Sequence, residues 1–113
     1  PIWGVRTHAI WLGSSVFDGA RVFEGVAPDL DLHCERVNAS AKAMFLDPVV
    51  PPERWIELVN EGRKRFDPDT PLYVRPMYWA ERAGPMALPP DPASTRWWRD
   101  WASACGCAWA ISP

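Results

Sequence analysis

The stretch that most constrains the fold of this chain is Thr7–Gly25, with the sequence THAIWLGSSVFDGARVFEG. Its glycines at positions 13, 19 and 25 interrupt short apolar runs, and glycine is tolerated where the backbone takes positive φ or another group approaches closely. Valine and phenylalanine at positions 16, 17, 22 and 23 favour a pleated, half-buried surface. The pattern predicts a turn near Gly13 and a strand over Val16–Phe23 that is bent or bulged at Gly19.

The bulk composition is that of a single small globular domain. Of 113 residues, 48% are hydrophobic, which allows one small core. A formal net charge of −2 gives no reason to expect nucleic-acid or membrane-surface binding, and no apolar run has the length of a membrane span. Three cysteines without a disulfide-framework spacing favour a reducing compartment, so we expect a cytoplasmic protein. No signal-peptide pattern opens the chain, and Pro1 in place of Met suggests an incomplete or processed start.

Two helices and two further strands are predicted after the opening stretch. A short strand at Asp29–Leu32 would pair with the first one in an antiparallel hairpin. From His33 the apolar residues recur at three- and four-residue spacing, which predicts a helix that ends before Pro48. A second helix is expected to begin at Pro51, and Leu72–Glu81 has the composition of a strand. The sum is an α+β domain, a mostly antiparallel sheet with two main helices packed on it.

Three polar side chains are candidates for binding. Arg36 offers a planar fork of donors that suits a phosphate ester, although a solvated helical arginine beside an acid is the simpler alternative. Tyr73 and Arg75 are two residues apart on the predicted strand and project from the same face, where a phenol and a guanidinium together suit a carboxylate. The alternative is a cross-strand tyrosine next to a surface arginine. Pro76 removes a ladder donor and therefore places this segment at a sheet edge or at an irregularity.

Three segments, in order, resemble motifs of the class IV aminotransferases, which bind pyridoxal 5'-phosphate. Thr7–Gly25 resembles the pattern HxxxxGxSVFEGxR, His33–Met44 (HCERVNASAKAM) resembles HxxRLxxSAxxM, and Leu72–Tyr78 (LYVRPMY) resembles a YIRP strand. The resemblance covers residues 7–96 and is to the N-terminal small domain of enzymes of the branched-chain amino acid aminotransferase type. It implies transfer of an amino group between an amino acid, with a branched-chain L-amino acid favoured, and 2-oxoglutarate as the 2-oxo acid.

The resemblance also implies roles for individual residues. Arg36 would contact the cofactor phosphate, and Tyr73 with Arg75 would bind substrate carboxylate groups, reaching into the site of a neighbouring subunit. Phe17 would form the wall of the pocket for an apolar side chain, and it could equally be a core residue. We expect the three polar groups to line one cavity with the bent opening strand as its wall. The family also implies a homodimer or a larger assembly.

Several features depart from the family pattern. Asp18 stands where the pattern usually has Glu, and Leu12 where it often has Tyr, so the substrate assignment is weaker than the family assignment. The Schiff-base lysine of the family lies in a second domain, and neither Lys42 nor Lys64 is at its place. We therefore assign no catalytic residue and expect the chain alone to bind the cofactor poorly and to be inactive. No cluster has metal-ligand spacing, so no metal site is assigned either.

Residues 97–113, WWRDWASACGCAWAISP, do not follow the family pattern, so we place the end of the small domain at residue 96. This Trp- and Cys-rich tail is interpreted as a truncated or out-of-frame terminus, or as an unusual but genuine strand and loop.

Two alternatives to a branched-chain enzyme remain. One is another member of the superfamily, namely an amine transaminase, a D-amino acid transaminase or an aminodeoxychorismate lyase-like enzyme. The other is a non-catalytic fragment that acts only by association.

Overall fold

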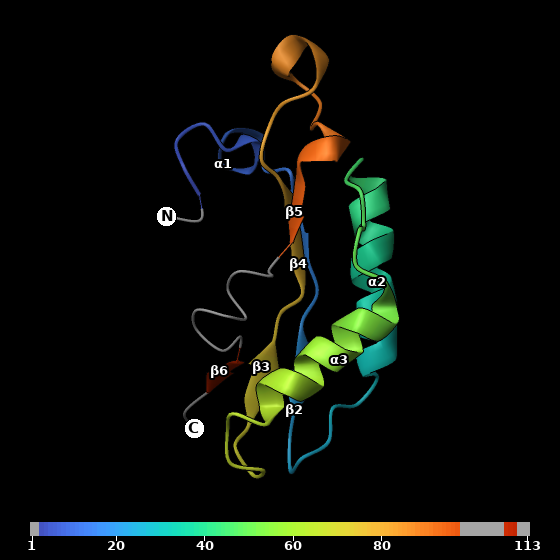
Figure 1. The fold of residues 1–113 in the computed structure, drawn as a ribbon, viewed down its shortest axis with the longest axis vertical. Helices are drawn as coiled ribbons and strands as arrows, with labels where there is room; N and C mark the ends of the chain where they lie inside the picture. The colour runs from blue at the N-terminus through green and yellow to red at the C-terminus, as the bar shows by residue number, and fades with distance from the viewer. Residues whose placement is uncertain (1–2, 98–107, 111–113) are drawn as a thin grey trace.

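The computed structural model describes residues 3–97 and 108–110 (Figure 1). The helices are α1 (His8–Leu12), α2 (Leu30–Ala43) and α3 (Pro52–Arg63), with two 3-10 turns, η1 (Pro85–Ala87) and η2 (Pro92–Ser94). The strands are β1 (Ser15–Phe17), β2 (Ala20–Val22), β3 (Leu72–Val74), β4 (Met77–Ala80), β5 (Thr95–Trp97) and β6 (Ala108–Ala110). The predicted α+β architecture, with two main helices packed on antiparallel sheets, is confirmed.

The strands form two antiparallel three-stranded sheets, in the orders β1-β4-β5 and β2-β3-β6. Val16 pairs with Tyr78 between β1 and β4, and Arg21 pairs with Tyr73 between β2 and β3. Because β1 runs into β2 and β3 runs into β4, the two sheets follow one another along the molecule. Helices α2 and α3 lie on the same side of these strands (Figure 1).

Strands β1 and β2 form one extended segment, β3 and β4 form another, and the two segments are interrupted side by side. Asp18 and Gly19 separate β1 from β2, and Arg75 and Pro76 separate β3 from β4. The backbone N–H of Asp18 donates to the carbonyl oxygen of Pro76 at 3.1 Å, so the two interruptions are joined. The bend predicted at Gly19 and the irregularity predicted at Pro76 are thus parts of one structural feature.

The strand predicted at Asp29–Leu32 is wrong. Helix α2 already begins at Leu30, and the chain before it makes only a tight turn in which Phe23 and Val26 exchange backbone hydrogen bonds. Leu30 is 8% exposed and adds one more position to the buried stripe of α2. Burial therefore favours a helix that starts about one turn before the predicted start at His33. The partner of β2 is the distant β3 instead.

The predicted turn near Gly13 is present, but the short helix α1 that precedes it was not predicted. Gly13 has φ 66°, in the left-handed region that glycine tolerates, and it caps the C-terminus of α1. His8 of α1 is buried, and its Nδ1 lies 2.7 Å from the hydroxyl oxygen of Ser14. A five-residue helix offers too short an apolar period to be recognised in a sequence.

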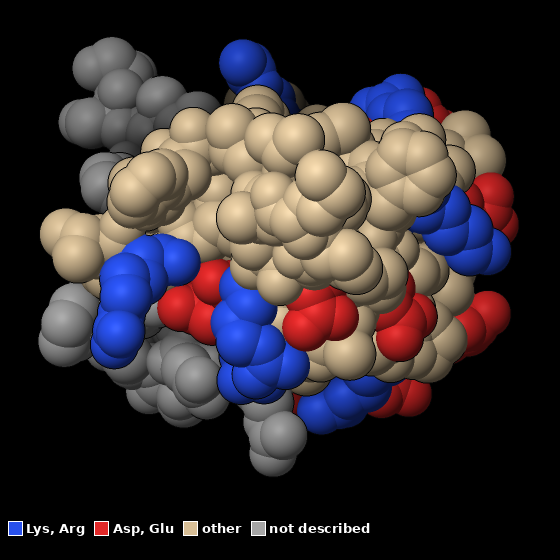
Figure 2. Space-filling model, turned by 90° about the horizontal axis from the view of Figure 1, so that it is seen from above, with Lys and Arg blue, Asp and Glu red and all other residues tan. Residues whose placement is uncertain are grey.

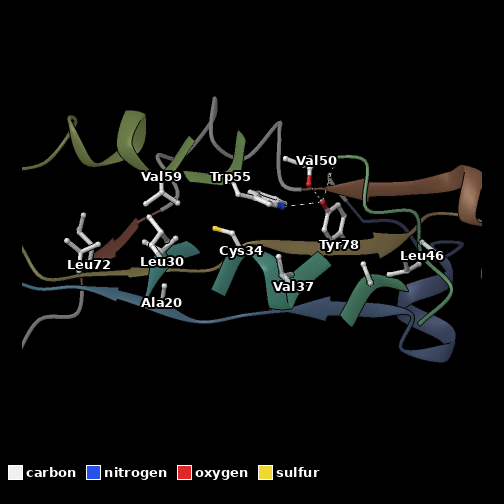
Figure 3. Packing of buried hydrophobic residues seen from close by; sticks show 14 residues of the cluster. Ala20, Leu30, Cys34, Val37, Leu46, Val50, Trp55, Val59, Leu72 and Tyr78 are labelled. Atoms are coloured by element: carbon white, nitrogen blue, oxygen red, sulfur yellow. Dashed lines mark hydrogen bonds between the residues drawn. The ribbon is translucent and has the colours of Figure 1, made fainter. Parts of the chain in front are cut away.

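The core fills the space between the sheets and the two long helices (Figure 3). Its members share near-complete burial and come from every layer: Leu30, Cys34, Val37 and Ala41 from α2, Leu46 and Val50 from the connection between α2 and α3, Trp55 and Val59 from α3, and Ala20, Val22, Leu72, Val74, Tyr78 and Ala80 from the strands. The hydroxyl of Tyr78 accepts hydrogen bonds from Trp55 Nε1 and from the backbone N–H of Val50, both at 3.2 Å. Burial raises the pKa of Tyr78.

The end of the molecule that carries η1 is largely uncharged. Viewed from there, positive and negative side chains alternate beside a broad uncharged area (Figure 2). Large apolar side chains of α1 and of the η1 segment are exposed: Ile10, Trp11, Leu12, Met86 and Leu88. Among the described residues, no helix is long and apolar enough to cross a membrane.

Candidate functional site

The candidate residues adjoin the interruption between β1 and β2. Phe17 is the last residue of β1, directly before this interruption, and Arg36, Tyr73 and Arg75 each contact one of residues 17–19. Two of the three come from the β3–β4 segment and the third from α2. The fold therefore brings together side chains that are up to 58 positions apart in the sequence (75 − 17).

Arg75 lies over the ring of Phe17. The guanidinium carbon is 3.8 Å from the ring centroid, a distance at which the π-system attracts the cation. Phe17 is 52% exposed, so it is not the core residue that the alternative interpretation suggested. Arg75 is exposed as well. Together they present a flat apolar surface with a positive charge on it.

Tyr73 packs against the backbone at Gly19. A Cβ built on Gly19 would be 2.6 Å from the Tyr73 hydroxyl oxygen, which is closer than real Cβ contacts. Ala20 and Val22 fill the core on the helix side, so the alternation of β2 directs Arg21 to the opposite face, and Tyr73 is its cross-strand partner. Tyr73 therefore lies on the sheet face opposite the helices.

Arg36 is bound to Asp18 through two of its guanidinium nitrogens, Nε and Nη2. Nε donates to Oδ2 at 2.5 Å and Nη2 donates to Oδ1 at 2.8 Å. Asp18 is only 6% exposed, and its Oδ1 also accepts from the backbone N–H of Gly19 and lies 2.7 Å from Nδ1 of His33. The Arg36 side chain itself is 63% exposed. The result is a buried carboxylate that anchors an otherwise exposed guanidinium.

These contacts set the protonation state of Asp18. The hydrogen bond from Arg36 is the largest cause of a pKa lowered from 3.8 to about 2, and the bonds from His33 and Gly19 act in the same direction. They outweigh the burial of the carboxyl, which raises its pKa. Asp18 reciprocally raises the pKa of Arg36. The pair is therefore ionised at neutral pH.

The candidates do not all approach from one side. Arg36 reaches the interruption from α2, on the side of the helices, whereas Phe17, Tyr73 and Arg75 lie on the other face. Strands β1 and β2 are both sheet edges, so the guanidinium of Arg36 sits at the rim of the sheet. The structure thus groups three candidates and sets Arg36 apart at the edge. The role of each remains a prediction.

Sequence reasoning missed the importance of Asp18 and His33. The motif comparison marks Asp18 only as a departure from Glu, yet a signal is present. Val16 and Ala20 pack inward, so alternation places position 18 inward too, and an acid there needs a cationic partner within reach. His33 and Arg36, one turn apart on α2, supply the donors.

Other chemistry is sparse in the described part of the chain. Lys42 and Lys64 are both exposed, the first on α2 and the second directly after α3. Within residues 3–97 and 108–110, no group of three His, Cys, Asp or Glu side chains could hold a metal ion.

The cysteines at positions 105 and 107 lie outside the described residues, as does most of the Trp-rich tail. Trp97 is described: it lies in β5 and packs against Trp55, with ring centroids 5.4 Å apart.

Sequence comparison identifies relatives of one kind. The family model described as amino-transferase class IV matches residues 15–100. A probable branched-chain-amino-acid aminotransferase of Synechocystis sp. is 31% identical over 91 residues, which cover 71% of this chain and 28% of that protein.

Solved structures agree with this similarity. An aminotransferase from Brucella abortus bound to PLP has a TM-score of 0.83 and 49% identity, over 86% of this chain and 35% of that one. The branched-chain amino acid aminotransferase of Escherichia coli has a TM-score of 0.69 and 26% identity, over 81% of this chain and 31% of that one. The branched-chain aminotransferase of the archaeon Thermoproteus uzoniensis with norvaline has a TM-score of 0.60 and 27% identity, over 70% and 28%. The chain spans about a third of the length of these relatives.

Proposed function

This chain belongs to the class IV aminotransferase family, and on that premise we propose that it is the N-terminal part of a pyridoxal 5'-phosphate-dependent transaminase. The proposed reaction moves an amino group between a branched-chain L-amino acid and 2-oxoglutarate. It is assigned to the whole protein, because the chain spans only about a third of its relatives. One observation carries the proposal: Phe17, Tyr73 and Arg75 lie on one sheet face, and the anchored Arg36 reaches the same strand interruption from the helix side.

Arg36 is the proposed ligand of the cofactor phosphate. Asp18 occupies Nε and Nη2, and among the described residues Nη1 has no hydrogen-bond partner, so one arm can still donate. The side chain is mostly exposed and cationic, which suits a phosphate ester. When bound, the cofactor supplies an electron sink for the amino transfer, and the chain's own residues supply binding and orientation.

Tyr73, Arg75 and Phe17 form the proposed substrate surface. The guanidinium of Arg75 and the hydroxyl of Tyr73 are donors for a carboxylate, and the exposed half of the Phe17 ring is an apolar surface for an aliphatic side chain. The similarity to two branched-chain enzymes supports this substrate class. We also propose a cytoplasmic homodimer for the whole protein, by resemblance to the family.

The substrate proposal is tested on the full-length protein that contains this chain. Leucine, D-alanine and a simple amine are each offered with 2-oxoglutarate, and glutamate formation is measured. Turnover of leucine at a higher kcat/KM than the other two supports the branched-chain assignment. Preference for D-alanine or the amine contradicts it and points to another member of the superfamily. Absence of turnover with every donor contradicts the enzyme assignment.

The cofactor role is tested with Arg36→Gln in the same protein. We expect the dissociation constant for pyridoxal 5'-phosphate to rise about tenfold or more, since a charge-assisted hydrogen bond is lost. Arg54→Gln is the matched control, because it removes the same charge from the surface of α3, where Arg54 pairs with Glu57 and Glu61. Equal effects of the two variants on cofactor affinity would show that Arg36 acts only through its charge.

A further inference from the structure

The buried carboxylate of Asp18 accepts hydrogen bonds on both of its oxygens at the edge of the sheet. It accepts from Nε and Nη2 of Arg36, and its Oδ1 accepts from the N–H of Gly19 at 2.7 Å. The nearby Nδ1 of His33 is 2.7 Å from the same oxygen. An ionised carboxylate can only accept, so this contact is a hydrogen bond in the tautomer that carries the proton on Nδ1, the same nitrogen that lies 3.0 Å from Nη2 of Arg36. In that tautomer His33 is a fourth donor, so three of the four donors meet at Oδ1 and Nε of Arg36 occupies Oδ2.

The geometry leaves Arg36 with a single orientation. A free arginine side chain samples many rotamers, and ordering one costs up to about 2 kcal/mol. Here two parallel hydrogen bonds to a buried, rigid partner fix the plane of the guanidinium, and the strand interruption fixes that partner in turn through the bond from Asp18 N to the oxygen of Pro76. The ordering is thus complete before any ligand arrives, and the remaining arm, Nη1, points away from Asp18.

We propose that Asp18 is a positioning residue, which fixes the guanidinium of Arg36 so that its Nη1 arm is presented to a phosphate group. The inference rests on the proposed phosphate role of Arg36 and adds to it the residue that makes that arginine competent. Asp18 touches neither the phosphate nor the reacting atoms. It acts through Arg36 alone.

The inference makes a prediction whose sign is opposite to that of simple electrostatics. Removing a negative charge next to an anion site should strengthen anion binding if charge alone mattered. If Asp18 instead positions Arg36, Asp18→Asn should weaken phosphate binding. Asp91→Asn is the matched control: it removes the same charge from a surface pair with Arg82 and retains an amide oxygen to accept from the N–H of Ala93.

The experiment uses the 113-residue chain, inorganic phosphate as the probe, and the ¹⁵N NMR signal of the Arg36 Nε–H group, assigned by its loss in Arg36→Lys. In the wild-type chain we expect a separate, slowly exchanging signal that shifts as phosphate is added. In Asp18→Asn we expect faster exchange and about tenfold weaker phosphate binding. Asp91→Asn should leave the exchange unchanged and bind phosphate as tightly as the wild-type chain or slightly more tightly. Asp18→Glu, which keeps a carboxylate, should restore part of both properties.

Each outcome decides one question. Phosphate binding by Asp18→Asn that equals or exceeds that of Asp91→Asn overturns the positioning role. A fast-exchanging Arg36 signal in the wild-type chain overturns it without any variant, which covers the case that Asp18→Asn does not fold. A slow wild-type signal that Asp18→Asn loses, together with no response to phosphate, supports the fixing of Arg36. The same titration of the full-length protein then tests the phosphate role, and no response there contradicts that role.

Discussion

The hydroxyl oxygen of Tyr73 on β3 lies where a side chain at Gly19 would begin, 2.6 Å from the position of a Cβ. Two further atoms of the Tyr73 ring would lie 3.0 and 3.1 Å away. Glycine at the strand interruption therefore serves the close approach of an aromatic ring, and position 19 controls where the phenol of Tyr73 stands.

Gly19→Ala should lower the free energy of unfolding by about 1 kcal/mol or more, because the new methyl group displaces a packed ring. Gly62→Ala is the matched control. Nothing lies within 4 Å of a Cβ placed on Gly62, and alanine favours a helix interior, so this variant should raise the free energy of unfolding by up to about 1 kcal/mol. Urea unfolding of both variants measures the difference. A Gly19→Ala variant as stable as Gly62→Ala would contradict the close approach.

The stability of the domain should fall in acid through Asp18. Its pKa is lowered to about 2 in the folded chain, so its contribution is present above the unfolded value of 3.8 and is lost as the pH falls through the folded value. We expect a loss of about 2 kcal/mol between roughly pH 4 and pH 2, and this loss should be absent from Asp18→Asn. Urea unfolding at several pH values measures it, and parallel curves for the two proteins would refute the claim.

Tyr78→Phe should destabilise the core by about 1–3 kcal/mol, because the backbone N–H of Val50 loses its acceptor in a buried place and the indole N–H of Trp55 keeps only Asn38 Oδ1. Tyr73→Phe removes the same atom from a half-buried ring on the opposite face and should change stability by less than about 0.5 kcal/mol. Thermal or urea unfolding separates the two. A loss of stability in Tyr78→Phe as small as the one expected for Tyr73→Phe would mean that the hydrogen bonds of Tyr78 contribute little.

Cys34 should resist alkylation in the folded chain. It is fully buried in the core, and burial is the largest cause of a pKa raised to about 11, with the charges of Asp18 and Asp31 acting in the same direction. Iodoacetamide labelling followed by peptide mass spectrometry should show an unmodified Cys34 in the native chain and full modification in denaturant. Rapid labelling of the native chain would contradict the packing of α2 against the sheets.

The isolated chain should form no site-specific adduct with pyridoxal 5'-phosphate. Lys42 and Lys64 are exposed on the helical layer, and a Schiff base needs a desolvated or otherwise activated amine. Borohydride reduction after mixing, followed by mass spectrometry, should show only weak, distributed labelling. A stoichiometric adduct on one lysine would overturn the expectation that this chain is inactive alone.

Much of the local structure could be predicted because it depends on neighbours in the sequence. The three- and four-residue apolar spacing after His33 and the proline at the start of α3 each specify a helix, and both are found. The prediction failed at Asp29–Leu32, where the short segment could pair as a strand or extend a helix. Only burial of Leu30 against the core decided for the helix.

The sequence by itself determined the order and type of the main elements, and the motifs of the family, because these depend on periodicity and on residue types within a few positions. The tertiary structure decided which strands pair, since β2 meets β3 across some fifty residues and no local pattern encodes that register. It also decided that Asp18 is the partner of Arg36. A buried carboxylate must find its counter-charge wherever the packed chain places one, and packing brings α2 against the strand interruption.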